Sequence, residues 1–275
     1  MTTWNVKDFG AKGDGMTDDT NSINKAISNA SSGDTIKVPK GTYMIDAIKS
    51  IKLKSNINFF MDSGAKLQVI PNDKKSYKTI VVRGCSNVKI SGGMVVGDRD
   101  DHKGEEGEWG HGLVVLGSKN IVVDNVACND MWGDGFYIDR IDGDRCKDVV
   151  LKNVMADRNR RQGLSVIDVN GLQVLNSTFQ RTGGTAPEDG IDFEPDRPTD
   201  LSKDVIENVL VKGCNFIHNA GAGVEFALKK GIGKNIRITG NKFAGNVGET
   251  IKSDTYNWWQ KIVYSIFGYP TSLSI

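Results

Sequence analysis

The segment EDGIDFEPD, residues 188–196, places five carboxylates within nine positions. They are Glu188, Asp189, Asp192, Glu194 and Asp196. Carboxylates at this density repel one another, and such crowding raises the pKa of at least one of them. Glycoside hydrolysis requires a protonated carboxyl group beside an ionised one, because one protonates the leaving oxygen and the other activates water or attacks the sugar. The segment is therefore expected to be one wall of a catalytic cleft, with a solvated acidic strand face as the alternative.

A metal site is another interpretation of the same acids. Calcium takes about six to eight oxygen ligands, and Asp189, Asp192, Glu194 and Asp196 would supply some of them. Their spacing does not match the EF-hand loop. We therefore predict no metal ligand and no cofactor, and keep Ca²⁺ as the weaker alternative.

Composition limits the partners and the location of the protein. The chain has 275 residues, with 35 Lys+Arg against 34 Asp+Glu, so its charge does not favour nucleic acid or a membrane surface as a partner. No apolar stretch reaches the ~18–20 residues that cross a bilayer, and MTTWNVKDFG lacks the basic and apolar regions of a secretory signal. We expect a virion-associated protein or one secreted by a signal-independent route, and otherwise a cytoplasmic one. The cysteines lack metal spacing and are expected to be free and buried.

Two sets of short strands recur along the chain. Segments of the first set alternate aliphatic and polar residues, which predicts strands with one buried face; they begin at 87, 120, 148, 171, 208 and 235. Segments of the second set have Gly in second place and apolar residues in third and fifth place; they are HGLVVL at 111, DGFYID at 134, QGLSVI at 162, DGIDFE at 189 and AGVEFA at 222. One such coil cannot bury its own face but stacked coils can, so the repeats indicate a solenoid.

The repeats predict an all-β solenoid that forms one domain over residues 1–275. We place an N-terminal strand and capping helix at 1–35, the coils at 36–250 and a C-terminal cap at 251–275. A β-sandwich is the alternative, but it does not predict glycines in register. Asn125, Asn153 and Asn176 recur at one turn and are expected to bond their amides from coil to coil.

Both ends of the solenoid are expected to be covered by helices. DDTNSINKAISNAS carries Ile23, Ala26 and Ile27 at helical spacing, which predicts an amphipathic helix over the first coil. Apolar residues from Trp258 to Phe267 also follow a helical stripe, which predicts a helical cap on the last edge. The same stripe is compatible with a contact between copies, such as a trimer.

The segment VKDFGAKGDGMTDDTNSINKAI resembles the start of the pectate-lyase-superfamily right-handed parallel β-helices. With the coils, the resemblance covers residues 4–250, and it implies that the solenoid is a single-stranded right-handed parallel β-helix. The superfamily includes polygalacturonase- and rhamnogalacturonase-like hydrolases, the catalytic modules of mannuronan C5-epimerases and phage tail-spike depolymerases, so it implies a polysaccharide partner. Asp14, Asp18 and Asp19 belong to the structural part of this signature and are expected to cap a turn and a helix.

Stacking turns each recurring position into a column of side chains about 4.8 Å apart. The third and fifth residues of the glycine segments should point inward, so the fourth and sixth should face outward, and the resemblance places the residue before the glycine at the groove rim. One face therefore gathers the candidate site residues. These are His111, Asp134, Tyr137, Asp139, Arg161, Gln162, Glu188, Asp189, Asp192, Glu194 and Glu225.

Within this set we predict Asp134, Asp189 and Asp192 as the catalytic acid and base groups and the other residues as substrate-binding. Asp134 and Asp189 are two coils apart, about 9–10 Å by stacking, near the ~6.5–9.5 Å of inverting glycosidases. WGDGF resembles the Asn-Thr-Asp-Gly-Phe coil of polygalacturonases, and PEDGI resembles their paired-aspartate segment. The order departs from that family, because the pair normally lies in the next coil, where this chain has RQG. Its Gly-His-Gly motif is matched only upstream, at residue 110.

Two alternative functions are kept beside a glycosidase that acts on uronate-containing or otherwise acidic polysaccharide. A lyase or C5-epimerase needs a base and a group that neutralises the sugar carboxylate, and His111, Tyr137 and Arg161 lie in successive coils. The coil order resembles the epimerase module, but Val114 and Leu116 stand where that family has Asp and His, which argues against this chemistry. A phage-tail or adhesin module that binds glycan without cleaving it is the non-enzymatic alternative.

Overall fold

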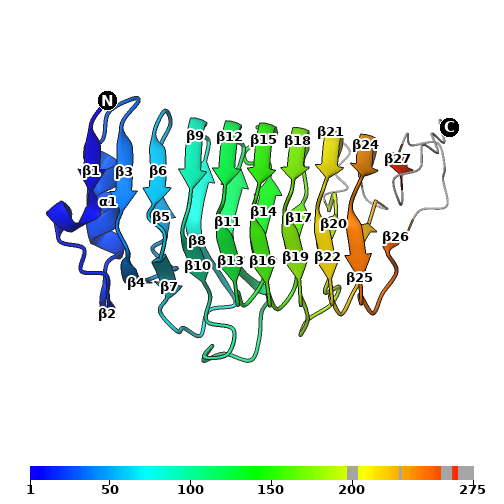
Figure 1. Ribbon diagram of the computed structural model, residues 1–275, viewed down its shortest axis with the longest axis horizontal. Helices are drawn as coiled ribbons and strands as arrows, with labels where there is room; N and C mark the ends of the chain where they lie inside the picture. The colour runs from blue at the N-terminus through cyan, green and yellow to red at the C-terminus, as the bar shows by residue number, and fades with distance from the viewer. Residues whose placement is uncertain (197–203, 229–230, 255–261, 266–275) are drawn as a thin grey trace.

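The computed structural model describes residues 1–196, 204–228, 231–254 and 262–265. The chain winds as a solenoid whose strands stack in order from the N-terminal to the C-terminal end, and they form three parallel sheets (Figure 1). This confirms the all-β solenoid and excludes the β-sandwich. No helix among the described residues is long and apolar enough to cross a membrane.

The three sheets run along the length of the solenoid, and each coil contributes a strand to them. Sheet 1 contains β1 (Thr3–Asn5), β3 (Thr35–Val38), β6 (Asn58–Met61), β9 (Ser86–Ser91), β12 (Lys119–Asp124), β15 (Cys146–Lys152), β18 (Val169–Leu175), β21 (Val205–Lys212), β24 (Ile232–Thr239) and β27 (Ile262–Ser265). Sheet 2 contains β2 (Asp14–Asp18), β4 (Gly41–Ile45), β7 (Ala65–Val69), β10 (Met94–Val96), β13 (Ala127–Asn129), β16 (Met155–Asp157), β19 (Thr178–Gln180), β22 (Asn215–Ile217) and β25 (Lys242–Ala244). Sheet 3 contains β5 (Ile51–Lys52), β8 (Ser76–Arg83), β11 (Trp109–Leu116), β14 (Phe136–Asp139), β17 (Leu164–Val166), β20 (Ile191–Phe193), β23 (Val224–Phe226) and β26 (Ile251–Ser253).

The alternating segments of the sequence form strands of sheet 1, and the glycine segments form strands of sheet 3. Sheet 3 has the register that the glycines predict, because Phe136, Leu164, Ile191 and Val224 are successive partners. The strands of sheet 2 were not predicted, and from β10 to β25 each has three residues, too few to show a period. The glycine segments therefore fix which side chains of successive coils lie next to one another.

A steric requirement explains the column of glycines before these strands. A Cβ atom on Gly163 would lie 2.4 Å from the carbonyl oxygen of Gly190, and one on Gly190 would lie 2.5 Å from that of Gly223. Such distances are far inside van der Waals contact, so only glycine lets the bends of neighbouring coils stack at this spacing. The register on which the candidate site depends is thus built into the sequence.

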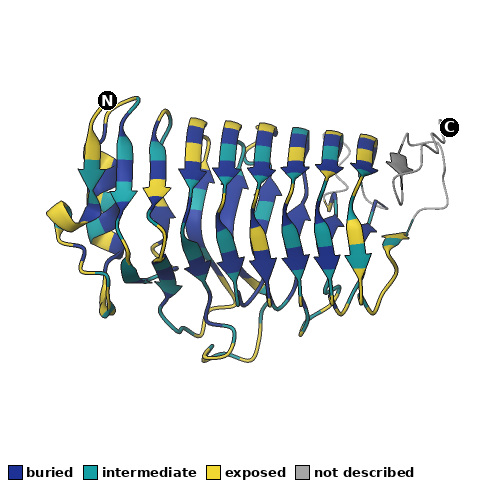
Figure 2. Cartoon of the chain, in the orientation of Figure 1, coloured by how far each residue is buried: buried dark blue, intermediate teal, exposed yellow. Residues whose placement is uncertain are grey.

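Apolar columns fill the interior of the solenoid. Buried positions alternate with more exposed ones along many strands, as Figure 2 shows. Phe193 and Phe226, in successive strands of sheet 3, stack with ring centroids 5.1 Å apart. Full burial of one such side chain contributes about 1.5–3 kcal/mol. The inward direction predicted for the third and fifth residues of the glycine segments is confirmed, because all of them are buried.

The predicted asparagine stack occurs at a different turn. Asn125, Asn153 and Asn176 share a left-handed backbone, which asparagine tolerates better than most residues, but the amide of Asn153 donates to Asp124 at 3.0 Å. An amide ladder runs instead at the start of sheet 1 strands. It joins Asn120 to Asn87 and Asn87 to Asn56, each at 2.7 Å.

The N-terminal end is covered as predicted. Helix α1 (Thr20–Asn29) follows the 3₁₀ helix η1 (Val6–Phe9) and buries Ile23, Ala26 and Ile27. The acids before it have structural roles, since the carboxylate of Asp19 accepts hydrogen bonds from the backbone of Lys12 and Gly13. The first coil is therefore closed by an amphipathic helix.

The C-terminal helix is not found where the structure can test it. Residues Ile262–Ser265 form β27, which pairs with β24 and so extends sheet 1 by one strand. Pairing with β24 supplies backbone partners for this segment. The other residues of the predicted helix lie outside the described part, and so does the surface that a trimer would use.

Candidate active site

The candidate site is built on sheet 3. Ser165 on β17, Asp192 on β20 and Glu225 on β23 occupy one column in register, and they alternate with the core residues and so point to the outer face. All three are nevertheless buried. Of the five acids of residues 188–196, Asp189 and Asp192 are buried, Glu188 and Glu194 are partly exposed and Asp196 is exposed, so a solvated strand face does not describe Asp189 and Asp192. β11 has Val114 at the same position, so the fold itself does not require polar residues in this column.

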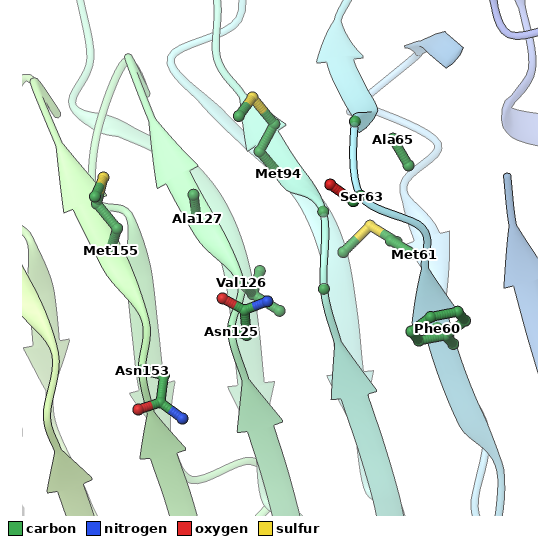
Figure 3. Close-up of a pocket in the computed structure, with 13 residues that line it drawn as sticks. Phe60, Met61, Ser63, Ala65, Met94, Asn125, Val126, Ala127, Asn153 and Met155 are labelled. Atoms are coloured by element: carbon green, nitrogen blue, oxygen red, sulfur yellow. The ribbon is translucent and has the colours of Figure 1, made fainter. Parts of the chain in front are cut away.

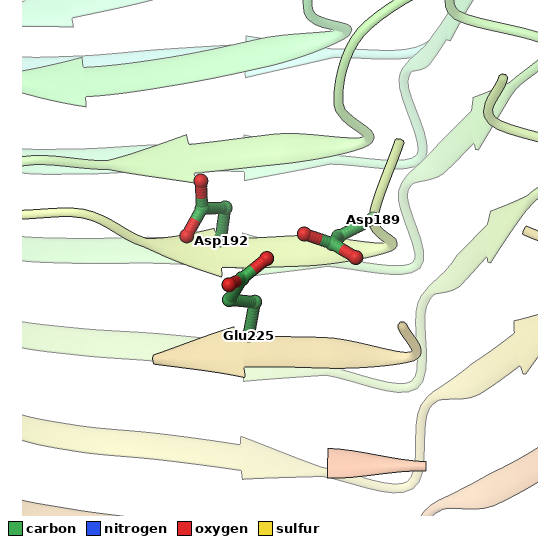
Figure 4. Close-up of side chains that lie close together, drawn as sticks. All are labelled: Asp189, Asp192 and Glu225. Atoms are coloured by element: carbon green, nitrogen blue, oxygen red, sulfur yellow. The ribbon is translucent and has the colours of Figure 1, made fainter. Parts of the chain in front are cut away.

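Three acids of this region form a cluster, which we call the carboxyl triad: Asp189, Asp192 and Glu225. Each offers an oxygen atom that lies within 4.8 Å of the others, and the three side chains point toward one another (Figure 4). Their exposed fractions are 1, 0 and 6 %. One oxygen of each acid receives no hydrogen bond from an N–H or hydroxyl group of any described residue. Because an ionised carboxylate only accepts hydrogen bonds, the triad is stable only if it also holds protons.

The electrostatics of the triad agree with this requirement. Burial and a hydrogen bond with Glu225 raise the pKa of Asp189 to about 8. Burial and the charges of Glu194 and Asp189 raise the pKa of Asp192 well above its usual range. These shifts support the prediction that a carboxyl group here stays protonated. Burial raises the two pKa values more than crowding does, and the neighbour that contacts Asp189 is Glu225.

Two polar groups orient the triad. The buried amide of Gln162 accepts a hydrogen bond from the backbone of Asp189 at 2.8 Å and donates to Asp192 at 3.0 Å. Oδ1 of Asp189 accepts a hydrogen bond from the backbone N–H of Ala222. Gln162 was predicted to bind substrate, but the structure gives its amide a positioning role between the two aspartates.

Asp134 lies in a different environment two coils away. It is fully buried and accepts a hydrogen bond from Ser165 at 2.9 Å. The guanidinium of Arg161 lies 3.5 Å from its other oxygen. Burial raises the pKa of Asp134 to about 6, although Arg161 and Ser165 act in the opposite direction. Asp134 therefore loses its proton at lower pH than Asp189 does.

His111 is neutral in this site. Its ring stacks on Tyr137 at 4.7 Å with an angle of 12° between the planes, and Nδ1 accepts the backbone N–H of Asp134 at 3.3 Å. Burial, with the nearby charges of Lys78 and Arg161, lowers the pKa of His111 to about 3. The 3.4 Å contact between Nδ1 and the Asp134 carboxylate is therefore not an ion pair at neutral pH.

Arg161 is shared by acids from three segments. Its guanidinium lies 3.1 Å from Glu194, 3.5 Å from Asp134 and 3.7 Å from Glu108. Burial alone would lower the pKa of Arg161, but Asp134 and Glu194 raise it above its usual value. Arg161 therefore links Asp134 to Glu194, which belongs to the acidic segment 188–196.

Some of the predicted residues lie apart from the triad. Glu188 accepts a hydrogen bond from the backbone of Gly184, four residues earlier in its own loop, at 2.6 Å. Asp139 accepts hydrogen bonds from the backbone of Arg140 and from the hydroxyl of Tyr137. The acids proposed as calcium ligands are also separated, because Glu194 pairs with Arg161.

Sequence reasoning missed two side chains that the structure adds. Ser165 occupies the fourth position of a glycine segment and could have been found from that column. Lys252, on β26, lies beside Glu225 with Nζ 2.7 Å from the carboxylate. Its segment, ETIKSD, lacks the glycine that marks the earlier coils, so the sequence pattern gave no sign of it.

The triad also has the atoms that a divalent cation would need, namely an oxygen from each of Asp189, Asp192 and Glu225. Calcium, however, takes about six to eight oxygens, and the ammonium of Lys252 already contacts Glu225. A proton-sharing triad balanced by Lys252 accounts for the arrangement without a cation.

A separate pocket lies at the bend between sheets 1 and 2 and is not part of this site. It has a volume of about 470 Å³ and includes Phe60, Met94, Asn125, Asn153 and Met155 in its lining (Figure 3). None of its lining residues is ionisable. It therefore offers no acid or base for catalysis.

Comparison with known proteins decides the family. The family model described as "Rhamnogalacturonase A/epimerase, pectate lyase-like" matches residues 3–258. The chain belongs to this family. It is 31 % identical over 248 residues to the uncharacterised protein YclG of Bacillus subtilis. The aligned region covers 80 % of this chain and 42 % of YclG. The chain thus spans less than half the length of that relative.

Solved structures agree on the fold. The pre-mature bacteriophage phi29 gene product 12 superposes with a TM-score of 0.78 and 18 % identity, covering 94 % of this chain and 36 % of that one. A tailspike protein, gp49 of Acinetobacter baumannii bacteriophage Fri1, described as a capsular polysaccharide depolymerase, superposes with a TM-score of 0.67 and 16 % identity, covering 95 % and 49 %. At these identities the likeness shows the fold alone. The activity must be argued from the site.

Proposed function

We propose that this family member is a glycoside hydrolase that cleaves an acidic polysaccharide, with Asp134, Asp189 and Asp192 as its acid and base groups. The observation that carries the proposal is the carboxyl triad. It is buried, one oxygen of each acid lacks an N–H or hydroxyl donor among the described residues, and Asp192 and Glu225 stand in the column where β11 has an apolar residue. Desolvated carboxyls are costly to a fold, and strongly shifted pKa values cluster at functional sites.

The two halves of the site suit the two roles of an inverting mechanism. Asp189, which keeps its proton up to a pKa of about 8, donates that proton to the glycosidic oxygen as the bond to the anomeric carbon breaks. Asp134, ionised above about 6, takes a proton from the water that attacks the same carbon. Two coil spacings correspond to roughly 9–10 Å between these groups, near the ~6.5–9.5 Å of inverting enzymes. Asp192 shares protons with Asp189 and supports its acid form.

Access to the acids is part of the proposal. Solvent reaches about a third of the side chain of Glu194, a tenth of that of Arg161 and half of that of Lys252. The carboxyl groups of Asp134 and Asp189 lie below the surface. A glycan would therefore meet the exposed groups first, and productive binding must open a path to the buried acids.

The geometry weighs against the lyase and epimerase alternatives. Arg161 already faces three carboxylates, so a sugar carboxylate would have to displace one of them. Nδ1 of His111 is occupied by a backbone N–H, and Val114, which stands at an acidic position of the epimerase pattern, is fully buried. Glycan binding without cleavage remains the competing outcome of the test.

The test is a panel of uronate-containing and other acidic polysaccharides with two readouts. Hydrolysis creates reducing ends without ultraviolet absorbance, whereas elimination creates an unsaturated uronate that absorbs. We expect reducing ends alone. An absorbing product would indicate elimination, with His111, Tyr137 and Arg161 as the catalytic candidates. Binding without any product would indicate that the chain recognises the glycan without cleaving it.

The pH dependence of cleavage follows from the two pKa values. A general base works only when ionised, so activity should rise as pH passes the pKa of Asp134 at about 6. A general acid works only when protonated, so activity should fall as pH passes the pKa of Asp189 at about 8. We expect a bell-shaped profile of kcat/KM with its maximum between these values. Activity that keeps rising through the alkaline range would remove Asp189 from the acid role.

A further inference from the structure

Lys252 stands at the end of the column that carries the triad. Ser165, Asp192, Glu225 and Lys252 are successive partners across β17, β20, β23 and β26. Nζ of Lys252 lies 2.7 Å from Glu225, whose side chain is only 7 % exposed, whereas that of Lys252 is 47 % exposed. The pair thus links solvent to the buried triad.

The charges around the triad make this ammonium important. The groups that face Glu225 are Asp189 and Asp192 from the coil of β20 and Lys252 from the coil of β26. Arg161 acts on Asp192 from the other side, but its guanidinium is held by Asp134 and Glu194. Lys252 is therefore the cation that contacts the triad within the described residues.

We propose that Lys252 is a functional part of the site, a positioning residue whose ammonium neutralises Glu225 and so determines how many protons the triad shares. The proposal rests on the acid role given to Asp189 above. With Lys252 present, the three carboxyl groups of the triad can hold two protons and one negative charge, which the ammonium balances. Without it, a further proton is the least costly way to balance the buried charge.

A consequence can be measured on the carboxyls themselves. Lys252 acts to lower the pKa of Asp189, against burial and Glu225, which raise it. Replacement of Lys252 by an uncharged residue should therefore move the titration of the triad to higher pH. We expect a shift of roughly 1 pH unit, at the low end of the effect of an adjacent opposite charge because the lysine is half exposed. Since the acids titrate together, the shift belongs to the triad as a whole.

The experiment is a titration of the aspartate and glutamate carboxyl carbons by NMR in the full chain and in Lys252→Gln. Lys234→Gln is the matched control, because Lys234 also lies 2.7 Å from a mostly buried glutamate, Glu207, and is 55 % exposed. The upper titration step of the triad should move in Lys252→Gln, stay in place in Lys234→Gln and return in Lys252→Arg. The alkaline limb of kcat/KM should move with it.

Superimposable triad titrations in the wild-type protein and in Lys252→Gln would overturn the proposal. So would equal shifts in both glutamine variants, which would indicate a general charge effect. The carboxyl titration does not depend on turnover, so failure of the glycosidase assignment is distinguishable from failure of the Lys252 assignment. If Lys252→Gln still cleaves the glycan but its alkaline limb of kcat/KM does not move, the Lys252 assignment alone is contradicted.

Discussion

Asp189→Asn should abolish cleavage of the glycan while leaving the protein folded. The amide is nearly isosteric with the carboxyl group but cannot donate an acidic proton, and general acid–base groups typically supply ~10²–10⁴-fold in rate. Because the pKa of Asp189 is about 8, the side chain is mostly neutral at pH 7, and a neutral amide is tolerated in its place. The amide oxygen still accepts the hydrogen bond from Ala222. We expect the free energy of unfolding to change by no more than about 1 kcal/mol.

Asp168→Asn is the control for this variant. Asp168 is also fully buried, but it pairs with Arg145 at the bend that follows sheet 3, away from the triad. Its replacement removes one of the two acids that pair with Arg145, the other being Glu207 at 2.7 Å, and should cost stability, while the folded fraction keeps its kcat. Near-normal turnover in Asp189→Asn on a confirmed substrate would refute the acid role, and lost turnover with a large fall in Tm would make Asp189 a structural residue.

Arg161→Met should be the most destabilising change in the site. It removes the positive charge shared by Glu108, Asp134 and Glu194, and among the described residues it leaves the buried Asp134 with Ser165 as its side-chain donor. Loss of one partner of a buried ion pair costs about 3–5 kcal/mol. We expect the lower end of that range in chemical denaturation near pH 8, because the side chain of Arg161 is partly exposed.

The cost should depend on pH in a defined direction. The folded-state pKa of Asp134, about 6, lies above its ordinary value of 3.8, so a protonated Asp134 is favoured by folding and an ionised one is not. Near pH 5 Asp134 is mostly neutral, so its attraction to the Arg161 guanidinium is weaker than at pH 8. The variant should therefore lose less stability near pH 5 than at pH 8. Arg83→Met is the control, since Arg83 and its partner Asp142 are both exposed, and it should cost about 1 kcal/mol or less at both pH values. An equal loss at both pH values in Arg161→Met would show that the arginine does not act through Asp134.

The sequence predicted the fold well because its signals are local and repeated. Gly163 and Gly190 recur at one position for a steric reason, so they reveal the register of sheet 3 and, through it, the neighbours of Asp189 and Asp192. The C-terminal helix was predicted from an apolar stripe, but at Ile262–Ser265 the chain continues sheet 1, because a free sheet edge can also be satisfied by one more strand.

The candidate site was predicted only in part, because side-chain partners across coils depend on packing. The column placed Asp192 and Glu225 together, but it did not show that they are buried or that Glu225 contacts Asp189. Glu188, which is next to Asp189 in the sequence, turns away to its own loop. Lys252 was missed because its coil lacks the glycine segment that guided the alignment.

The most direct test of the account is cleavage of a responsive glycan in isotopically labelled water, with mass spectrometry of the products. Hydrolysis takes one oxygen from water for each bond broken, so each new reducing end should carry one labelled oxygen in the wild-type protein, and no product should form with Asp189→Asn. Unlabelled ends with an unsaturated uronate, or binding of the glycan without any cleavage, would contradict the assignment of the carboxyl triad to glycoside hydrolysis.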